Sequence, residues 1–315
     1  MILVTGGCGF IGMHTVRALL DAGEDVVAGY HSTRREPEIW SDALGSRLHV
    51  EEVDVANAAQ LNAVVQKYNV NGIVHLAMPG YGKLTPAQDF ATNMPGLLNV
   101  LEAVREHSMK RVTLMSSSAV YAGLPEGPFL EDARLPMQST SPTEAYKKAW
   151  EILAFHFADR SGIDVAAARV PGIYGPLYYS MMNLPSRLCH AAARGNEPNY
   201  QGAIGGAPKE DTEMDFLFVK DCARGLTLLQ MADNPAHRVY NFGVGKSVKN
   251  RELAEAVLDV EPNARIRLEP GGGVDPSPHR YLDITRARAD LGFEPAYDIK
   301  RGVAEFLHWL GGHEQ

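Results

Sequence analysis

The chain alternates short apolar runs, rich in β-branched residues, with longer segments in which apolar residues recur at helical spacing. A short run that is apolar throughout is typical of a parallel strand covered by helices on both faces. Up to about residue 170 the pattern predicts strands near 2–5, 25–29, 48–53, 72–76, 111–115 and 164–170, with helices near 10–20, 57–68, 87–107 and 142–160. Right-handed crossovers between them give a doubly wound parallel α/β sheet.

The regular alternation ends at Gly175-Pro176. Residues 177–213 are rich in Gly, Pro, Asn and other polar residues, and we interpret them as an insertion over the sheet. Beyond them the pattern predicts short strands near 216–219 and 239–242 and helices near 251–258 and 284–291. We therefore expect a smaller C-terminal unit beside the large sheet.

Composition excludes several classes of protein. The chain has 315 residues, of which 45% are hydrophobic and 22% charged, so a disordered scaffold is excluded. With 38 acidic and 30 basic residues, net charge -8 and no long basic run, nucleic acid is not an expected partner. The three cysteines, Cys8, Cys189 and Cys222, form no disulfide framework or metal clip. No apolar run reaches about 18 residues and no leader is recognisable, so we expect a cytoplasmic protein without a membrane partner or metal site.

A glycine-rich turn follows the first predicted strand. Gly6, Gly9 and Gly12 form a GxxGxxG pattern that leads into a helix through Phe10 and Ile11. The first glycine permits a sharp turn, the second lets a pyrophosphate approach the backbone, and the third allows close helix packing. Free N–H groups at the helix N-terminus attract the phosphates. The turn therefore predicts dinucleotide binding by a Rossmann-type sheet.

Several further motifs occur in a fixed order along the chain: Val74–Ala77, Ser116–Tyr121, Arg169–Pro176, Asp215–Asp221 and Asp283–Pro295. With the glycine turn they resemble the extended short-chain dehydrogenase/reductase family, in its NAD-dependent epimerase/dehydratase branch. The resemblance implies a dinucleotide-binding domain of residues 1–172 with 215–245 and a substrate-binding domain of residues 173–214 with 246–315. It also implies cofactor contacts from Asp54, Val55, Leu76 and Ala77.

The loop after the second strand bears on the choice of cofactor. An NAD enzyme normally has a carboxylate there for the ribose hydroxyl, whereas this chain has Tyr30 followed by Ser32, Arg34 and Arg35. Hydroxyl and guanidinium groups suit a 2′-phosphate better, so the sequence favours NADP and retains NAD. In the alternative, the two arginines are solvated and pair with acidic residues of the same loop.

The resemblance also implies a catalytic set. The family uses a substrate-holding hydroxyl, here Ser117, and a tyrosine four residues before a lysine, which puts phenol and ammonium on one helical face. Lys147 matches the lysine, because Glu151 follows it at the family's offset, and it also contacts the cofactor ribose. That register places Thr143 where the tyrosine belongs. Tyr146 is nearby, but its i+4 neighbour is a tryptophan.

Three interpretations of this departure remain open. Tyr146 swings in from a shifted helix start, Thr143 relays a proton from another acid or from water, or catalysis is impaired. A threonine hydroxyl has too high a pKa to become an alkoxide beside a single lysine, so the usual proton transfer is altered in each case. Ser117 and Lys147 keep their roles in most of these interpretations.

The substrate motifs depart as well. Gly172, Met214 and Gly273 stand where the family usually has an asparagine and two arginines for a nucleotide-sugar diphosphate, which favours a smaller substrate. Compensating cations would come from Arg187, Arg280 or Lys83. An aromatic and methionine-rich stretch beside the expected pocket suits a sugar ring: it comprises Tyr174, Tyr178, Tyr179, Met181 and Met182.

The leading hypothesis is an NAD(P)-dependent oxidoreductase that transfers hydride at a secondary alcohol or ketone of a sugar-like or other small polar substrate. The first alternative is a nucleotide-sugar epimerase or dehydratase that retains its cofactor, and the second is a catalytically impaired cofactor-binding protein. The predicted helices near 87–107 and 142–160 resemble those that pair across the family's dimer interface, so we also expect a homodimer.

Overall fold

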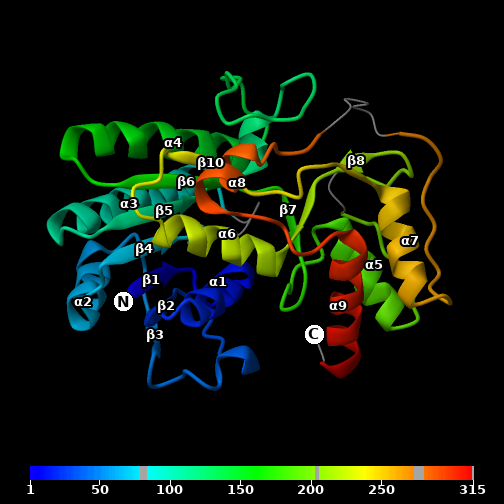
Figure 1. The fold of residues 1–315 in the computed structure, drawn as a ribbon, viewed down its shortest axis with the longest axis horizontal. Coiled ribbons are helices and arrows are strands. Elements are labelled where there is room, and N and C mark those ends of the chain that lie inside the picture. Colours follow the sequence, from blue (N-terminus) through cyan, green and yellow to red (C-terminus); the bar gives the residue numbers. More distant parts are fainter. Residues whose placement is uncertain (79–83, 203–205, 273–279, 314–315) are drawn as a thin grey trace.

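A computed structural model describes residues 1–78, 84–202, 206–272 and 280–313. Its main feature is a parallel sheet of seven strands in the order β10-β6-β5-β4-β1-β2-β3 (Figure 1). The strands are β1 (Ile2–Thr5), β2 (Val26–Tyr30), β3 (Leu48–Glu52), β4 (Gly72–His75), β5 (Arg111–Met115), β6 (Val165–Arg169) and β10 (Val239–Asn241). The chain builds outward from β1 to β3 and then returns to add β4 on the other side of β1. The order of strands therefore reverses between β1 and β4, which is where such sheets bind ligands.

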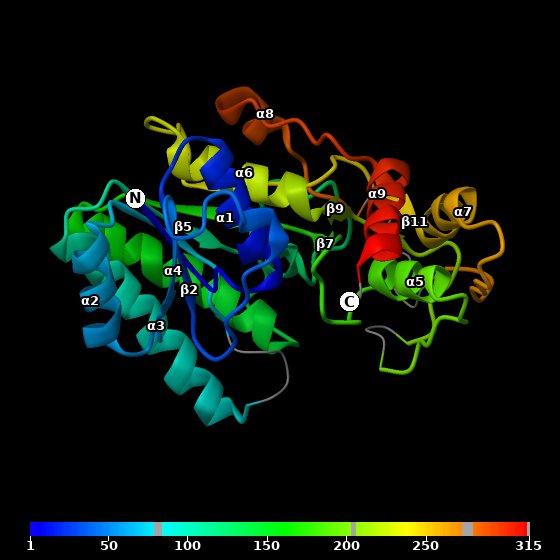
Figure 2. The ribbon, with the colours of Figure 1, turned by 90° about the horizontal axis from the view of Figure 1, so that it is seen from below.

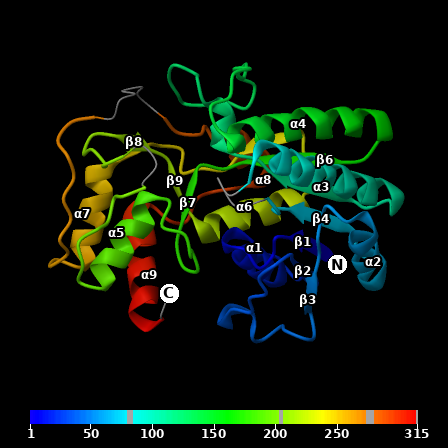
Figure 3. The ribbon, with the colours of Figure 1, turned by 180° about the vertical axis from the view of Figure 1, so that it is seen from behind.

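The strands are mostly apolar because both faces of the sheet are covered, although the edge strand β3 carries a histidine and two glutamates. Leu3 and Val4 are both fully buried, but Leu3 packs into the core on one face and Val4 into the core on the other. Helices α1 (Phe10–Asp21) and α6 (Val219–Met231) pack against each other on the face that Val4 contacts. Helices α2 (Ala58–Tyr68), α3 (Pro86–Glu106) and α4 (Pro142–Ser161) cover the opposite face. Figure 3 shows α3 and α4 side by side on this face.

A smaller unit lies beyond one end of the sheet (Figure 2). Its helices share one apolar core: α5 (Leu184–Ala193), α7 (Asn250–Val260) and α9 (Ile299–Gly312). Two short strand pairs accompany them, β7 (Gly172–Tyr174) with β9 (Phe216–Phe218) and β8 (Glu213–Met214) with β11 (Val248–Lys249). Helix α8 (Thr285–Leu291) packs instead on the core around α1 and α6, through Ala287.

Two buried aspartates of the motif at 215–221 tie these parts together. Asp215 accepts hydrogen bonds from the backbone N–H groups of Val244 and Leu282, at 3.2 and 3.1 Å, and burial raises the pKa of its carboxyl to about 7. Asp221 accepts from the backbone N–H groups of Ala296 and Tyr297. Each carboxylate thus anchors a C-terminal segment to the body of the protein, which is a structural role.

The main departures from the predicted elements lie in the second half. The stretch interpreted as an irregular insertion contains α5, and the pattern did not predict α6 or α9. Helix α3, Pro86–Glu106, agrees with the helix predicted near 87–107. None of the helices in the described part of the chain is long and apolar enough to span a bilayer.

Candidate active site

The glycine turn brings β1 into contact with the end of β4. Gly6 has φ +69°, and a Cβ on it would lie 3.1 Å from the backbone nitrogen of Ala77. A Cβ on Gly12 would lie 2.1 Å from the carbonyl oxygen of Gly6, and a Cβ on Gly7 would lie 2.8 Å from the Cα of Ala28. Gly7 is a packing glycine that the sequence pattern did not single out. Three of the four positions therefore exclude any side chain for internal packing reasons.

Gly9 differs from these three glycines. A Cβ there would approach one neighbour within 4 Å, the carbonyl oxygen of Gly6 at 3.1 Å, among the described residues. Gly9 is also the N-cap of α1, and no side chain of the described residues caps this helix end. The first N–H groups of α1, from Phe10 and Ile11 onward, are consequently available to an anion. The open side of Gly9 and these donors are what a pyrophosphate requires.

The end of β4 is fixed to the same turn through Thr5. The Oγ1 atom of Thr5 accepts hydrogen bonds from the backbone nitrogens of Leu76 and Ala77, at 3.2 and 3.3 Å. Thr5 also hydrogen-bonds to Nδ1 of His75 at 2.8 Å. The structure thus places the predicted cofactor residues Leu76 and Ala77 beside the glycine turn.

Lys147 belongs to α4, and its side chain reaches the end of β5, the neighbour of β4. Its side chain is 4% exposed and Nζ donates a hydrogen bond to the carbonyl oxygen of Met115 at 2.6 Å. The pKa of Lys147 is lowered to about 7, because the cost of burying the ammonium outweighs the attraction of Glu151. Ser117 follows the same strand, and its Oγ accepts from the backbone nitrogen of Ala119 at 3.1 Å. Lysine and serine are therefore both presented at the carboxyl edge of the sheet.

A buried network of hydrogen bonds and an ion pair holds α4 against the sheet one turn after Lys147. Glu151 forms an ion pair with Arg169 at 2.6 Å and accepts a short hydrogen bond from Ser116. Arg169 also donates to the hydroxyl of Tyr121 at 2.7 Å. These contacts join α4, β5 and β6 one turn beyond Lys147, and so they fix the rotation of α4 about its axis.

Helix α4 begins at Pro142, with Ser141 as its N-cap accepting from the backbone nitrogen of Glu144 at 3.2 Å. Thr143 lies one turn before Lys147 and is partly exposed. Tyr146 is also partly exposed, and burial and the charge of Asp89 raise the pKa of its phenol. The surroundings of Tyr146 thus disfavour the phenolate that a proton acceptor requires.

The loop after β2 uses its arginines internally. Arg34 pairs with Glu36, and Arg35 donates to the carbonyl oxygen of Cys8 at 3.2 Å while its guanidinium lies 4.6 Å from the ring centroid of Tyr179. Ser32 is exposed. The pairing of Arg34 with a loop carboxylate agrees with the alternative stated for the sequence.

Asp54 and Val55 follow β3. One carboxylate oxygen of Asp54 accepts from the backbone nitrogen of Ala56 at 2.9 Å. Val55 packs on α3, where a Cβ on Gly96 would lie 2.9 Å from a Val55 methyl group. Both residues follow the strand that pairs with β2.

The candidate substrate cations are placed only in part. Arg187 donates to the carbonyl oxygens of Asn199 and Gln201. Lys83 and Gly273 lie outside the described residues. Gly172 begins β7, and Met214 is 43% exposed in β8.

Sequence comparison decides the family. The model of the NAD dependent epimerase/dehydratase family matches residues 2–243. The chain belongs to this family. It is 29% identical to dTDP-glucose 4,6-dehydratase of Streptomyces griseus, over 99% of this chain and 94% of that protein. It is 30% identical to dTDP-4-dehydro-6-deoxy-D-allose reductase of Streptomyces bikiniensis, over 99% and 96%.

Solved structures show the same fold. The dTDP-glucose 4,6-dehydratase of Bacillus anthracis, in complex with NAD, aligns with a TM-score of 0.83 at 22% identity, over 99% of this chain and 97% of that one. The UDP-glucose 4-epimerase of Thermotoga maritima, with UDP-glucose, aligns with a TM-score of 0.81 at 22% identity, over 98% and 97%. The predictions of a Rossmann-type fold and of an epimerase/dehydratase-family enzyme are confirmed.

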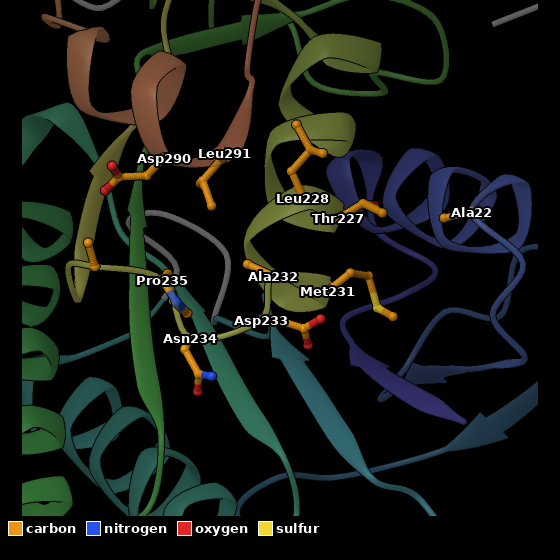
Figure 4. Close-up of a pocket in the computed structure, with 11 residues that line it drawn as sticks. Ala22, Thr227, Leu228, Met231, Ala232, Asp233, Asn234, Pro235, Asp290 and Leu291 are labelled. Atoms are coloured by element: carbon orange, nitrogen blue, oxygen red, sulfur yellow. The ribbon is translucent and has the colours of Figure 1, made fainter.

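Two surface hollows are found in the described part of the chain, one near the end of α6 and one beside the loop after β2. One, of about 490 Å³, lies between the end of α6 and α8 and is lined by Thr227, Met231 and Leu291 among others (Figure 4). The other, of about 570 Å³, lies between Arg35 and Trp309. Neither contains Ser117, Thr143 or Lys147, so we define the site by the strand ends and the glycine turn.

Proposed function

We propose that the chain is a sugar-modifying enzyme that transfers hydride at a secondary alcohol or ketone with a bound nicotinamide dinucleotide. The observation that carries the proposal is the juxtaposition of the open Gly9 turn at β1, the end of β4 and the buried Lys147 at the end of β5. The cofactor, when bound, accepts or returns the hydride. The residues of the chain bind it, orient the substrate and move the proton.

The parts of the site divide this work. The N–H groups at the start of α1 bind the pyrophosphate over Gly9, and Leu76 and Ala77 contact the dinucleotide from β4. Lys147 holds the nicotinamide ribose with its ammonium, and the hydroxyl of Ser117 holds the substrate oxygen. As hydride leaves the carbinol carbon, the substrate hydroxyl releases its proton and a ketone forms.

The first experiment tests cofactor binding. Gly9→Val places a branched side chain in the space left for the pyrophosphate, so affinity measured by calorimetry should fall below detection while the circular dichroism spectrum is retained. Undiminished affinity would remove the glycine turn from the site.

We propose NAD rather than NADP as the cofactor. The NADP preference drawn from the sequence loses its support, because the guanidinium of Arg34 is paired with Glu36 and that of Arg35 with the Cys8 carbonyl and Tyr179. The Bacillus anthracis structure holds NAD, which supports the same choice. Calorimetric titration with each dinucleotide decides it, and a tighter NADP complex would restore the preference inferred from the loop.

For the substrate we favour a nucleoside diphosphate sugar, the class named for the dTDP-sugar and UDP-sugar relatives. A panel of nucleotide-linked and free sugars, followed by absorbance and product analysis, separates the hypotheses. Turnover of a nucleotide sugar without net cofactor reduction indicates epimerisation or dehydration. Net reduction with a free sugar indicates the simple oxidoreductase that Gly172 and Met214 favour, and binding without turnover indicates an impaired protein.

For the proton we favour a relay through Thr143: its oxygen accepts the substrate proton as its own proton passes to water. Thr143→Tyr restores a phenol one turn before Lys147 and should raise turnover by about 10²- to 10⁴-fold, the range of a positioned acid-base group. Tyr146→Phe should leave turnover unchanged. The opposite pair of results would assign the proton transfer to Tyr146.

We also propose a homodimer formed through α3 and α4. Their outward faces carry large apolar side chains that are exposed in the single chain: Phe90 63%, Leu98 52%, Ile152 61% and Leu153 45%. Such a patch is typical of a surface covered by another protein. Light scattering at micromolar concentration should return twice the 34.4 kDa chain mass, and Ile152→Glu should return the monomer.

A further inference from the structure

Trp150 lies in α4 three residues after Lys147 and is 2% exposed. The Nζ atom of Lys147 lies 4.2 Å from the centroid of its ring. A cation at this distance over an indole is attracted by the negative face of the π system. Among the residues described, the ammonium therefore has two partners on this chain, the carbonyl oxygen of Met115 and the ring of Trp150.

The ring itself is held by β4 and β1. The imidazole of His75 stacks on it, with centroids 4.8 Å apart and planes 24° from parallel. His75 is hydrogen-bonded in turn to Thr5, the residue before the glycine turn. Burial and the nearby Lys147 lower the pKa of His75 to about 3, so the imidazole is neutral at ordinary pH and adds no repulsion. The position of the ring is thus set by the two strands that border the cofactor turn.

The carboxylate of Glu151 does not take the place of this ring. It faces Lys147 from the same helix, but both of its oxygens are held by Arg169 and one also by Ser116. An ammonium has three N–H donors. With one directed to Met115 and one to the indole, the third remains for a ligand.

We infer that Trp150 is the positioning residue for the Lys147 ammonium, holding it with the ring face so that one donor points toward the cofactor ribose. This rests on the proposed function, in which Lys147 binds that ribose. It assigns a binding role to a side chain that would otherwise only fill the core between α4 and the sheet.

Two substitutions test the ring. Trp150→Met fills much of the space without a π face, whereas Trp150→Phe keeps a ring. We expect Trp150→Met to weaken NAD binding about tenfold by calorimetry and Trp150→Phe to remain within about threefold of the wild type. Leu101→Ala is the matched control, since Leu101 is 2% exposed in the same apolar core but lies on α3. It should lower the melting temperature without changing NAD affinity.

A second readout follows Lys147 directly. The lysines are ¹³C-methylated, and the NMR resonance of Lys147 is assigned by its absence from the spectrum of Lys147→Met. In Trp150→Met this resonance should titrate about one pH unit lower than in the wild type, because the charged form of Lys147 loses its ring partner. The other titratable groups that face Lys147, His75 and Glu151, are the same in Trp150→Met as in the wild type. Leu101→Ala should titrate as the wild type does.

The outcomes are separable. If the wild type binds neither dinucleotide, the proposed function fails, and the NMR titration still decides whether the ring holds the ammonium. If the wild type binds NAD and Trp150→Met matches Leu101→Ala in affinity and titration, the positioning role is wrong. Should Trp150→Met not fold, tryptophan fluorescence decides: the wild type should show a pH-dependent quenching step that Lys147→Met lacks, and its presence in both would overturn the inference.

Discussion

Two lysines stand next to each other on α4 and both are buried, yet they face different regions. Lys148 faces the segment before the helix, where Nζ donates to the carbonyl oxygens of Pro136 and Gln138 at 2.6 and 2.9 Å and to the carboxylate of Glu144 at 2.8 Å. All three donors of this ammonium are therefore satisfied. Its partners come from the chain itself, so Lys148 fastens that segment to the helix.

Lys147 faces the sheet edge and lacks such a set. It has one carbonyl partner, Met115, and the ring of Trp150, while the carboxylate of Glu151 that attracts it is paired with Arg169. A buried charge with a complete set of partners holds structure together, whereas one with a spare donor is prepared for a ligand at a cost in stability. The comparison agrees with the proposed roles, in which Lys148 is structural and Lys147 binds the cofactor.

The largest effect on stability should come from Lys148→Met. The change leaves Glu144, which is 3% exposed, as a buried carboxylate without its partner, and breaking such a pair costs about 3–5 kcal/mol. Urea unfolding should show this loss, while NAD affinity of the folded protein should stay within about twofold. A loss below about 1 kcal/mol would show that the pair is no stronger than an exposed one.

The second effect falls on binding. Under the proposed function, Lys147→Met removes a charge-assisted hydrogen bond to the cofactor and should weaken NAD binding about 100-fold, or about 2.7 kcal/mol. The melting temperature should not fall, because an apolar side chain replaces an ammonium that burial disfavours. The two lysine variants should thus give opposite patterns. A Lys147→Met protein that loses stability and keeps NAD would reverse the assignment.

The first half of the fold could be predicted because its signals are local. Leu3 and Val4 belong to a run that is apolar at every position, which predicts a strand buried on both faces, and Gly6 follows it at once. Helix α5 was missed because its flanks are rich in Asn and Gly. The Asn183 cap with Pro185 at the helix start was the signal that could have found it.

The candidate site divides in the same way. The spacing of Thr143 and Lys147 along one helix is a local property, so the sequence could predict that both side chains lie on the same face of that helix. The stacking of His75 on Trp150 joins residues 75 positions apart, and the bond from Arg35 to Cys8 joins a loop to a turn. Such contacts depend on how strands and loops are placed in space, which a single sequence does not specify.

The smallest expected effect is a dependence of the free energy of unfolding on pH. It tests most directly the difference between Lys147 and Lys148. Lys147 has a pKa of about 7 in the folded protein and 10.5 in the unfolded chain. Below pH 7 both states carry the proton, so the cost of burial is present in full. Between pH 7 and 10.5 the unfolded chain holds a proton that the folded protein has lost, so stability rises with pH, by at most about 1.4 kcal/mol per pH unit.

Urea unfolding at pH 7.5 and 8.5 measures this slope, and the variants share the background set by the other groups, including Asp215, whose raised pKa of about 7 makes stability fall with pH. Among the described residues, the buried histidines His14, His75 and His190 have pKa values lowered by burial and contribute their full stability above about pH 6.5. Above pH 8.5 the buried thiols of Cys189 and Cys222 lower stability as the pH rises. Burial raises their pKa, so they ionise in the unfolded chain before they ionise in the folded protein. Lys148→Met should keep the wild-type slope and Lys147→Met should lose it. If all three slopes are equal, the Lys147 ammonium is not held at a cost, and the contrast between the two faces of α4 rests on geometry alone.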